Sequence, residues 1–471
     1  AGMYDPAESS THELGIYSMS QTYGSGATVS FEAFEQVLIG NYESSHQIFW
    51  EVQSANMPVL ETASFSSIIG LGPPETSAAD AWLGAEESVD RILRHLNNSE
   101  SKVATSLSAA ADLDITAAIS MTRKPALVRS LGIDSFSLCL GYKMGSDGYI
   151  VWNDDSADRM PGIFHELPLV GQHTWSISLT EPHLSFEQEF GFLLDKVQRE
   201  KAEKVNATPF LDALESARQV YDKYKPPVGS NFTKSHFFGE SGDGFNITRL
   251  MVDTLNKVPL APTLKSGLID AFSPLGCSKG CSALLDSGTS LLVMPASMIY
   301  RIQTAMEALG VNCSDLGKLP DLVITLGDVT LSLPPDSYLA KQAAGVIPTH
   351  LQGLVRAQTI SAAGVGANKV QENDHCRLMI MESTATTQHG ELFILGMPFF
   401  RKYYTTFTYG ETRESRKVQV ARAGDGCVPV ADTPLLNHIL NRTVPHRELD
   451  FQQMYVPRSV QAAHTQKYVR V

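Results

Sequence analysis

The segment that most constrains the fold of this chain is residues 283–292, with the sequence ALLDSGTSLL. An apolar run leads into an acid, a hydroxyl, a glycine and two further hydroxyls, after which the chain becomes apolar again. Glycine permits a tight turn, on which the carboxylate of Asp286 can accept hydrogen bonds from hydroxyls and backbone N–H groups. The segment predicts two buried strands joined by a loop that orients a carboxylate. An ordinary loop between buried strands is the alternative.

Two distant segments repeat one pattern, in which two apolar residues precede a glycine. They are residues 65–72 (FSSIIGLG) and residues 392–398 (LFILGMP). Aromatic and β-branched residues punctuated by glycine predict short strands through residues 15–72, at 135–140 and 175–179, and in several stretches from 283 to 421. We therefore expect a mainly β chain with a duplicated architecture.

Two stretches of helical character interrupt these strands. The first runs over residues 78–96, where Trp82, Val89 and Ile92 recur at helical spacing, and a Ser/Ala-rich stretch without a clear period follows it. The second covers residues 184–227. Both stretches are expected to fold onto the body more readily than to bind a partner.

Charge and motif content exclude several classes of function. There are 37 basic and 51 acidic residues, a net charge of −14, which does not suit a protein that coats nucleic acid or anionic membrane. No apolar run reaches the 18 or more residues of a membrane span. Phosphate-, zinc- and calcium-binding patterns are missing, so we expect no metal and no cofactor. The G-x-S-x-G match at residues 276–280 leads into a strand, whereas a serine hydrolase elbow opens a helix.

Glycosylation sequons indicate the compartment. Asn-x-Ser/Thr occurs six times, where about two would be expected by chance. The sequons begin at Asn97, Asn206, Asn231, Asn246, Asn312 and Asn441. This excess favours an oxidising, glycosylating compartment, so we expect a protein that is secreted or held in an endomembrane lumen of the lysosome or vacuole kind.

Taken in order, these motifs resemble the pepsin-like aspartic endopeptidases of the cathepsin D and plasmepsin kind. Residues 4–11 (YDPAESST) resemble the family's F-D-P-x-x-S-S-T segment, residues 23–26 (YGSG) its flap, and residues 65–72 its F-D-G-I-L-G-L segment. Residues 277–281 (CSKGC) and 286–290 (DSGTS) are similar to the small disulfide loop and second catalytic motif of the C-terminal lobe. The resemblance covers residues 4–422, with gaps at the two helical stretches.

The resemblance implies a bilobal, double-barrel β fold with helical insertions. The N-terminal lobe would be residues 1–170, with an insertion at about 73–130. The C-terminal lobe would be residues 171–423, with an insertion at about 180–275, and a tail would follow at 424–471. In this family each lobe gives one aspartate and the close pair shares a proton. One carboxylate activates water for attack on a peptide bond, and the other, protonated, supplies the leaving amine with a proton.

Residue roles follow from the same resemblance. Asp286 would be the catalytic aspartate of the C-terminal lobe, braced by hydrogen bonds from Ser287 and Thr289, and Tyr23 would lie on the flap that closes over substrate. The implied substrate-binding residues are Tyr23, Gly24, Ser287, Gly288, Thr289 and Ser290. The implied disulfides are Cys277–Cys281 and Cys313–Cys376.

Two cysteines are left without an implied partner. Cys139 lies in an apolar strand, so we expect a buried thiol there. A bridge from Cys139 to Cys427 is the less favoured alternative.

The sequence departs from the family pattern where the second catalytic aspartate, that of the N-terminal lobe, would be expected. Asp5 is the only aspartate before Ile68, and it is followed by Pro6 where the family has Thr-Gly. Because residues 4–6 match a segment downstream of the family's first motif, that motif is expected to precede residue 1 or not to exist. Ser66 and Ser67 replace a further Asp-Gly.

Two functions follow from this departure. The first is an aspartic endopeptidase that acts on peptide or protein substrates and whose first Asp motif is supplied elsewhere, including by a separate N-terminal chain. The second is a non-catalytic relative that binds peptides or partner proteins through its cleft. In either case we expect this polypeptide alone to be inactive on peptides.

Overall fold

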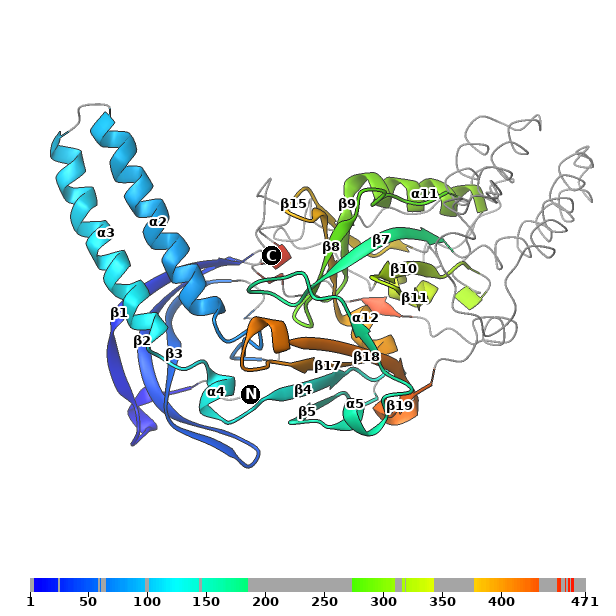
Figure 1. The fold of residues 1–471 in the computed structure, drawn as a ribbon, viewed down its shortest axis with the longest axis horizontal. Coiled ribbons are helices and arrows are strands. Elements are labelled where there is room, and N and C mark those ends of the chain that lie inside the picture. The colour runs from blue at the N-terminus through cyan, green and yellow to red at the C-terminus, as the bar shows by residue number, and fades with distance from the viewer. Residues whose placement is uncertain are drawn as a thin grey trace, which may run out of the picture.

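A computed structural model gives the fold of the chain (Figure 1). It describes residues 4–23, 26–57, 60, 65–97, 101–143, 146–184, 273–309, 316–317, 319–342, 377–431, 447–449, 454, 456–457 and 459–460. The predicted helical stretch beyond residue 184 lies outside the described residues. So do Gly24, Cys313, Cys376 and the sequon asparagines Asn206, Asn231, Asn246, Asn312 and Asn441.

The first sheet consists of three long antiparallel strands in the order β1-β2-β3, after a short 3-10 turn, η1 (Pro6–Glu8). The strands are β1 (Glu13–Tyr23), β2 (Gly26–Ile39) and β3 (Tyr42–Asn56). Gly26 is required at the start of β2, because its φ is +141° and a Cβ there would lie 1.9 Å from the carbonyl oxygen of Asn56. On the buried side, Glu32 is 1% exposed and pairs with Lys124, so a charge removed from water keeps its counter-ion.

Two helices, α2 (Thr76–Asn97) and α3 (Ser101–Thr122), form an antiparallel hairpin beside this sheet (Figure 1). The helix predicted at residues 78–96 is therefore confirmed, and α3 is the Ser/Ala-rich stretch for which no period was found. Small buried residues on both helices (Ala85, Ala111 and Ala118) allow their backbones to approach closely. Because α3 carries alanine on several faces, its apolar residues mark no single stripe. No helix among the described residues is long and apolar enough to span a membrane.

A six-stranded sheet joins residues from both predicted lobes, because β4 lies between β5 and β17 in the order β19-β18-β17-β4-β5, with β6 paired to β18. Its strands are β4 (Ser135–Cys139), β5 (Tyr149–Trp152), β6 (His165–Leu167), β17 (Tyr403–Thr408), β18 (Lys417–Ala423) and β19 (Pro429–Val430). The short helix α4 (Leu127–Ser130) precedes β4, and short helical turns follow β5, β17 and β18: α5 (Ser156–Arg159), η6 (Arg413–Ser415) and η7 (Asp425–Cys427).

An eight-stranded sheet holds most of the buried core, in the order β11-β10-β7-β8-β16-β9-β14 with β15 paired to β16. Its strands are β7 (Ser176–Leu184), β8 (Cys281–Leu285), β9 (Leu292–Pro295), β10 (Leu322–Leu326), β11 (Val329–Leu333), β14 (Ile380–Ser383), β15 (Thr386–Thr387) and β16 (Gly390–Leu395). The accompanying helices are α11 (Ala296–Leu309), η3 (Pro335–Ser337) and α12 (Met397–Lys402). A small sheet, β13-β12-β20, consists of Arg377–Leu378, Leu339–Gln342 and Glu448–Leu449.

The base of the helical hairpin is fixed to the six-stranded sheet through the carbonyl of Leu71. Trp175 Nε1 and Tyr409 Oη both donate hydrogen bonds to this oxygen, at 2.9 and 3.2 Å. The buried Arg416 donates to Glu75 Oε2 at 2.7 Å and also to the carbonyls of Gln172 and Tyr409. These bonds satisfy polar groups that would otherwise be buried unpaired, and they set the point at which α2 leaves the body.

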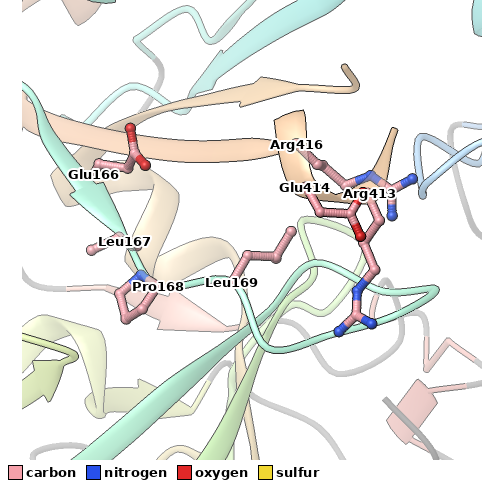
Figure 2. A pocket seen from close by; sticks show the side chains of 7 residues that line it. All are labelled: Glu166, Leu167, Pro168, Leu169, Arg413, Glu414 and Arg416. Carbon is pink, nitrogen blue, oxygen red and sulfur yellow. The ribbon is translucent and has the colours of Figure 1, made fainter. Parts of the chain in front are cut away.

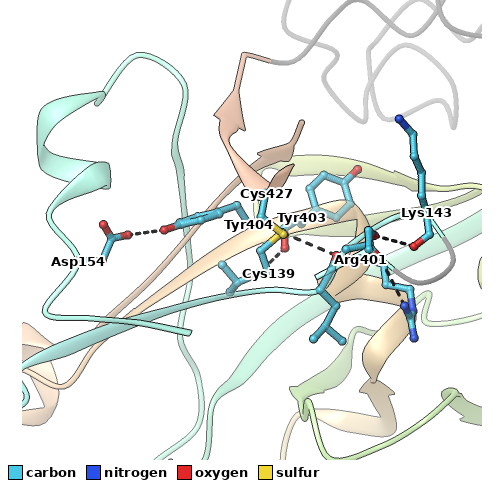
Figure 3. The surroundings of a disulfide bond; sticks show 11 residues. Cys139, Lys143, Asp154, Arg401, Tyr403, Tyr404 and Cys427 are labelled. Carbon is cyan, nitrogen blue, oxygen red and sulfur yellow. Dashed lines mark hydrogen bonds between the residues drawn. A yellow bond between two sulfur atoms is a disulfide. The ribbon is translucent and has the colours of Figure 1, made fainter. Parts of the chain in front are cut away.

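One disulfide corrects the prediction for Cys139. Cys139 at the end of β4 and Cys427 in η7 are joined across 288 residues of sequence (Figure 3). The expected buried thiol is therefore wrong, because the turn after β18 brings Cys427 beside the end of β4, a proximity that neither local sequence predicts. The bridge links the first part of the described tail to the six-stranded sheet.

Removing this bridge should destabilise the protein. In the variant Cys139→Ser/Cys427→Ser, we expect the free energy of unfolding to fall by about 2–5 kcal/mol, because the unfolded chain regains the freedom that the long cross-link removes. Urea unfolding without reductant measures the change. An equal fall in the parent protein on selective reduction of the same bridge is the matched check, and an unchanged midpoint in the variant would contradict the expectation.

Close to this disulfide, Asp154 accepts hydrogen bonds from Tyr404, Ser137 and Ser156. The bond from Tyr404 is 2.9 Å long and is drawn as a dashed line in Figure 3. Burial by itself raises the pKa of Asp154, but the hydrogen bonds outweigh it and hold this pKa below the ordinary value of 3.8. Burial and the bond to Asp154 raise the pKa of Tyr404 to about 12. The charged form of Asp154 therefore stabilises the fold.

Asp154→Asn should lower the free energy of unfolding by about 1–2 kcal/mol at neutral pH, because the carboxylate is only partly buried. Since the folded pKa of Asp154 lies below its unfolded value, its contribution is full above pH 3.8 and is lost as the pH falls through the folded pKa. The gap between parent and variant should narrow below that pH in urea titrations. The exposed Asp158→Asn is the control, and a gap that stays constant with pH would refute the assignment.

Candidate active site

The candidate site is the loop between β8 and β9, where Asp286 follows the buried end of β8. Asp286 Oδ1 accepts a hydrogen bond from the backbone N–H of Gly288 at 2.9 Å, and Oδ2 accepts one from Thr289 Oγ1 at 2.9 Å. Thr289 is fully buried and Asp286 is half-buried. Two donors thus fix the plane of a carboxylate that still reaches the surface, as the glycine turn predicted.

The end of β16 packs against this loop and is hydrogen-bonded to it on both sides of Gly396, a contact that we call the crossing. β16 runs parallel to β8, with Leu395 opposite Leu285. The Asp286 N–H donates to the carbonyl of Leu395 at 3.1 Å, and the Met397 N–H donates to the carbonyl of Thr289 at 2.8 Å. Backbone bonds on both sides of Gly396 therefore hold the carboxylate loop in register with β16.

Gly396 is required by this crossing. A Cβ at residue 396 would lie 2.1 Å from the carbonyl oxygen of Leu291 and 2.4 Å from that of Thr289. Real Cβ atoms do not approach backbone oxygens so closely, so any side chain at this position would push β16 and the loop apart.

Only some of the predicted site residues contact Asp286. Thr289 makes its implied bond, whereas Ser287 is exposed and Gly288 provides the second bond within the loop. Ser290 is half-buried. Tyr23 lies at the end of β1, where its hydroxyl donates to Gln21 Oε1 at 2.8 Å.

Two further expectations fall on described residues. Cys277 and Cys281 form a disulfide directly before β8, the pairing that the resemblance implied. The sequon residue Asn97 is the last residue of α2.

One contact to Asp286 was not foreseen from the sequence. Ser459, in the polar tail, donates from its Oγ to Asp286 Oδ2 at 2.5 Å. The two residues are 173 apart in the chain. An isolated serine in a polar segment carries no pattern, so only the fold could have identified it.

Residues 65–72, which share the apolar-glycine pattern of residues 392–398, have a different environment from that segment. Ile68 and Ile69 are 54% and 52% exposed, whereas Ile394 and Leu395 are buried. No neighbouring atom lies within 4 Å of a Cβ built on Gly70. Among the described residues, no strand pairs with this segment in the way that β8 pairs with β16.

A separate hollow of about 310 Å³ lies between the end of β6 and η6. Figure 2 shows Leu167, Pro168 and Leu169 on one segment and Arg413, Glu414 and Arg416 on another. Arg416 already donates to Glu75 and to two carbonyl oxygens, so its charge is balanced within the fold. The described residues contain no group of three or more His, Cys, Asp or Glu side chains that could hold a metal ion.

The fold is mainly β, and its Asp-Ser-Gly-Thr loop is hydrogen-bonded to a strand that ends in glycine. Comparisons with known proteins show what this chain is similar to. The family model described as eukaryotic aspartyl protease matches residues 1–100 and 246–360. Pepsin A of Sus scrofa is 31% identical over 181 residues, and pepsin A of Bos taurus is 29% identical over 146 residues. The chain is therefore similar to the eukaryotic aspartyl proteases over the matched residues, and its mainly β architecture is that of the bilobal pepsin-like fold.

These matches cover only part of each protein. The match to Sus scrofa pepsin A spans 36% of this chain and 38% of the relative, and the match to Bos taurus pepsin A spans 30% and 31%. Gastricsin of Suncus murinus is 28% identical over 145 residues, 29% of this chain and 30% of the relative. The activity and substrates of the complete relatives therefore do not transfer automatically to this chain.

The crowding at Gly396 gives a paired test of the site geometry. Gly396→Ala should lower the free energy of unfolding by about 1–3 kcal/mol, because the new methyl group must displace two backbone carbonyls. Gly70→Ala, in the matching segment with open space, should change it by less than about 0.5 kcal/mol. Urea unfolding followed by tryptophan fluorescence measures both, and equal effects of the two substitutions would contradict the described crossing.

Proposed function

We propose that the chain is an aspartic endopeptidase in which Asp286 is one of the two catalytic carboxylates. The observation that carries this proposal is the loop geometry: Asp286 is braced by Gly288 and Thr289 and lies at the surface, beyond a buried strand end. A carboxylate whose plane is fixed by two donors can accept a proton from a water molecule in a defined direction. In the fully assembled site, Ser287, Gly288 and Ser290 would line the cleft beside Asp286, and Tyr23 and Gly24 would form the flap.

Amide hydrolysis by this mechanism needs a second carboxyl group. One carboxylate takes the proton of the attacking water, and the other, protonated, gives a proton to the leaving nitrogen. We propose that the second aspartate comes from a strand that pairs with residues 68–70, in the way that β8 pairs with β16. The support is the exposure of Ile68 and Ile69 and the open space at Gly70. A separate N-terminal chain is one source of that strand.

A non-catalytic role is the second candidate, and two observations favour it. Ser66 and Ser67 stand where the family has Asp-Gly, and the Ser459 hydroxyl already occupies an oxygen of Asp286. In that case the cleft binds peptides or partner proteins without cleaving them.

We further propose an oxidising lumen as the location of the protein. The two disulfides among the described residues, Cys139–Cys427 and Cys277–Cys281, support it. The Cys313–Cys376 bridge and glycan addition at the six sequons belong to the same proposal.

The proposed activity can be tested on two forms of the chain. The first is the chain alone, and the second is the chain preceded by a pepsin-derived segment that carries the Asp-Thr-Gly motif. We expect no cleavage of denatured haemoglobin by the chain alone at about pH 4 and measurable cleavage by the fusion, because only the fusion brings two carboxyl groups together. The released peptides are quantified by mass spectrometry.

The controls are two isosteric substitutions in the fusion. Asp286→Asn should lower the cleavage rate at least about 100-fold, because a general base is lost. Asp328→Asn, at an exposed position in the β10–β11 turn, should leave the rate unchanged. Cleavage by the chain alone would refute the need for a second aspartate. A folded fusion that stays inactive also when it carries Ser459→Ala would favour the non-catalytic candidate.

A further inference from the structure

We propose that the described residues of the C-terminal tail, 447–449, 454, 456–457 and 459–460, bind the body as an intramolecular strap that occupies Asp286 and must leave before a substrate can bind there. The inference rests on the proposed function only in taking Asp286 as the reactive carboxylate. Three observations support the contact between the strap and the body: an ion pair at the start of the strap, buried apolar side chains further along it and a hydrogen bond to Asp286 near its end.

The strap begins at a buried ion pair. Arg447 Nε donates to Asp336 Oδ2 at 2.8 Å, and Arg447 Nη2 donates to the carbonyl of Tyr142 at 2.9 Å. The Asp336 side chain is 2% exposed and that of Arg447 is 12% exposed. Partner geometry of this quality is needed to offset the cost of desolvating two charges, so the start of the strap is held at a defined place.

The next residues extend a sheet of the body. The backbone N–H of Lys341 donates to the carbonyl of Arg447 at 2.9 Å. β20 (Glu448–Leu449) then pairs in parallel with β12, with Lys341 opposite Glu448. The strap therefore adds a strand to a sheet edge, which is a common mode of peptide binding by proteins.

Three described residues of the strap are apolar and buried. Met454, Val456 and Val460 are each less than 5% exposed. They share one buried cluster with residues of β9, β12, β14 and β16: Val293, Ala340, Met381, Leu392 and Ile394. One of these strands, β9, directly follows the Asp286 loop, so displacing the strap would expose apolar surface next to the site.

Near its end the strap reaches the carboxylate. Ser459 Oγ donates to Asp286 Oδ2, the same oxygen that accepts from Thr289 Oγ1. With Gly288 on Oδ1, the carboxylate then has three donors. A water molecule or a substrate group that needs Oδ2 must compete with a hydroxyl held in place by the burial of Val456 and Val460.

Chemical labelling of Asp286 tests the strap without any need for activity. The full chain is treated with a water-soluble carbodiimide and glycinamide, and the labelling of each carboxyl group is followed by peptide mass spectrometry. In Val456→Asp/Val460→Asp, two charges enter the buried cluster, so the strap should detach and Asp286 should be labelled at least about five-fold faster than in the parent chain. The matched control is Val428→Asp, at an exposed position, which should leave the rate unchanged.

Two carboxyl groups within the chain report on the state of the fold. Asp328 is exposed and should be labelled equally in all variants, while Asp321 is buried and bonded to Ser332 and should remain protected. A double variant that keeps Asp321 protected and labels Asp286 no faster than the parent chain overturns the proposal.

If the double variant also loses protection at Asp321, the milder Ser459→Ala decides. This variant removes only the hydroxyl, and faster labelling of Asp286 supports the strap, whereas an unchanged rate overturns it. Because labelling requires neither a second aspartate nor turnover, an inactive fusion protein in the haemoglobin assay leaves this result unaffected. Conversely, a labelling result that overturns the strap does not contradict the proposed proteolysis.

Discussion

The crossing of β16 behind the Asp286 loop is the contact on which the rest of the C-terminal sheet depends. Two backbone hydrogen bonds flank Gly396, and the absence of a side chain there lets the carbonyls of Thr289 and Leu291 approach. That contact places the carboxylate at the sheet surface and aligns β8 with β16. Since the strands that make the crossing also carry the buried cluster, the packing of the core and the orientation of Asp286 depend on the same strands.

The two apolar-glycine segments show how far a sequence pattern depends on its partners. Residues 394–396 are buried because β8 lies alongside, whereas residues 68–70 share the pattern but have no strand partner among the described residues. Isoleucine favours a strand at either place, yet burial requires a neighbour that the segment itself does not contain. The same local preference thus gives different burial in the two segments.

The predictions that succeeded rested on local physical chemistry, and those that failed depended on contacts distant in sequence. The apolar run before Asp286 and the helical spacing around Trp82 were sufficient to place β8 and α2. The helix α3 escaped detection, because a Ser/Ala-rich helix buries small residues without an amphipathic stripe. The Cys139–Cys427 bridge was the less favoured alternative, because Cys139 lies in an apolar strand and its sequence does not reveal that a cysteine 288 residues away comes close.

By itself, the sequence determined the strand-rich composition, the glycine turn that carries Asp286 and the resemblance to aspartic proteases, because strand preference and turn chemistry act over a few residues. Tertiary structure alone decided which groups surround that aspartate. Gly288 rather than Ser287 supplies a donor, and Ser459 arrives from the far end of the chain. The reason is that a hydrogen bond depends on distance in space, which chain folding sets only after the buried core has fixed the positions of the strands.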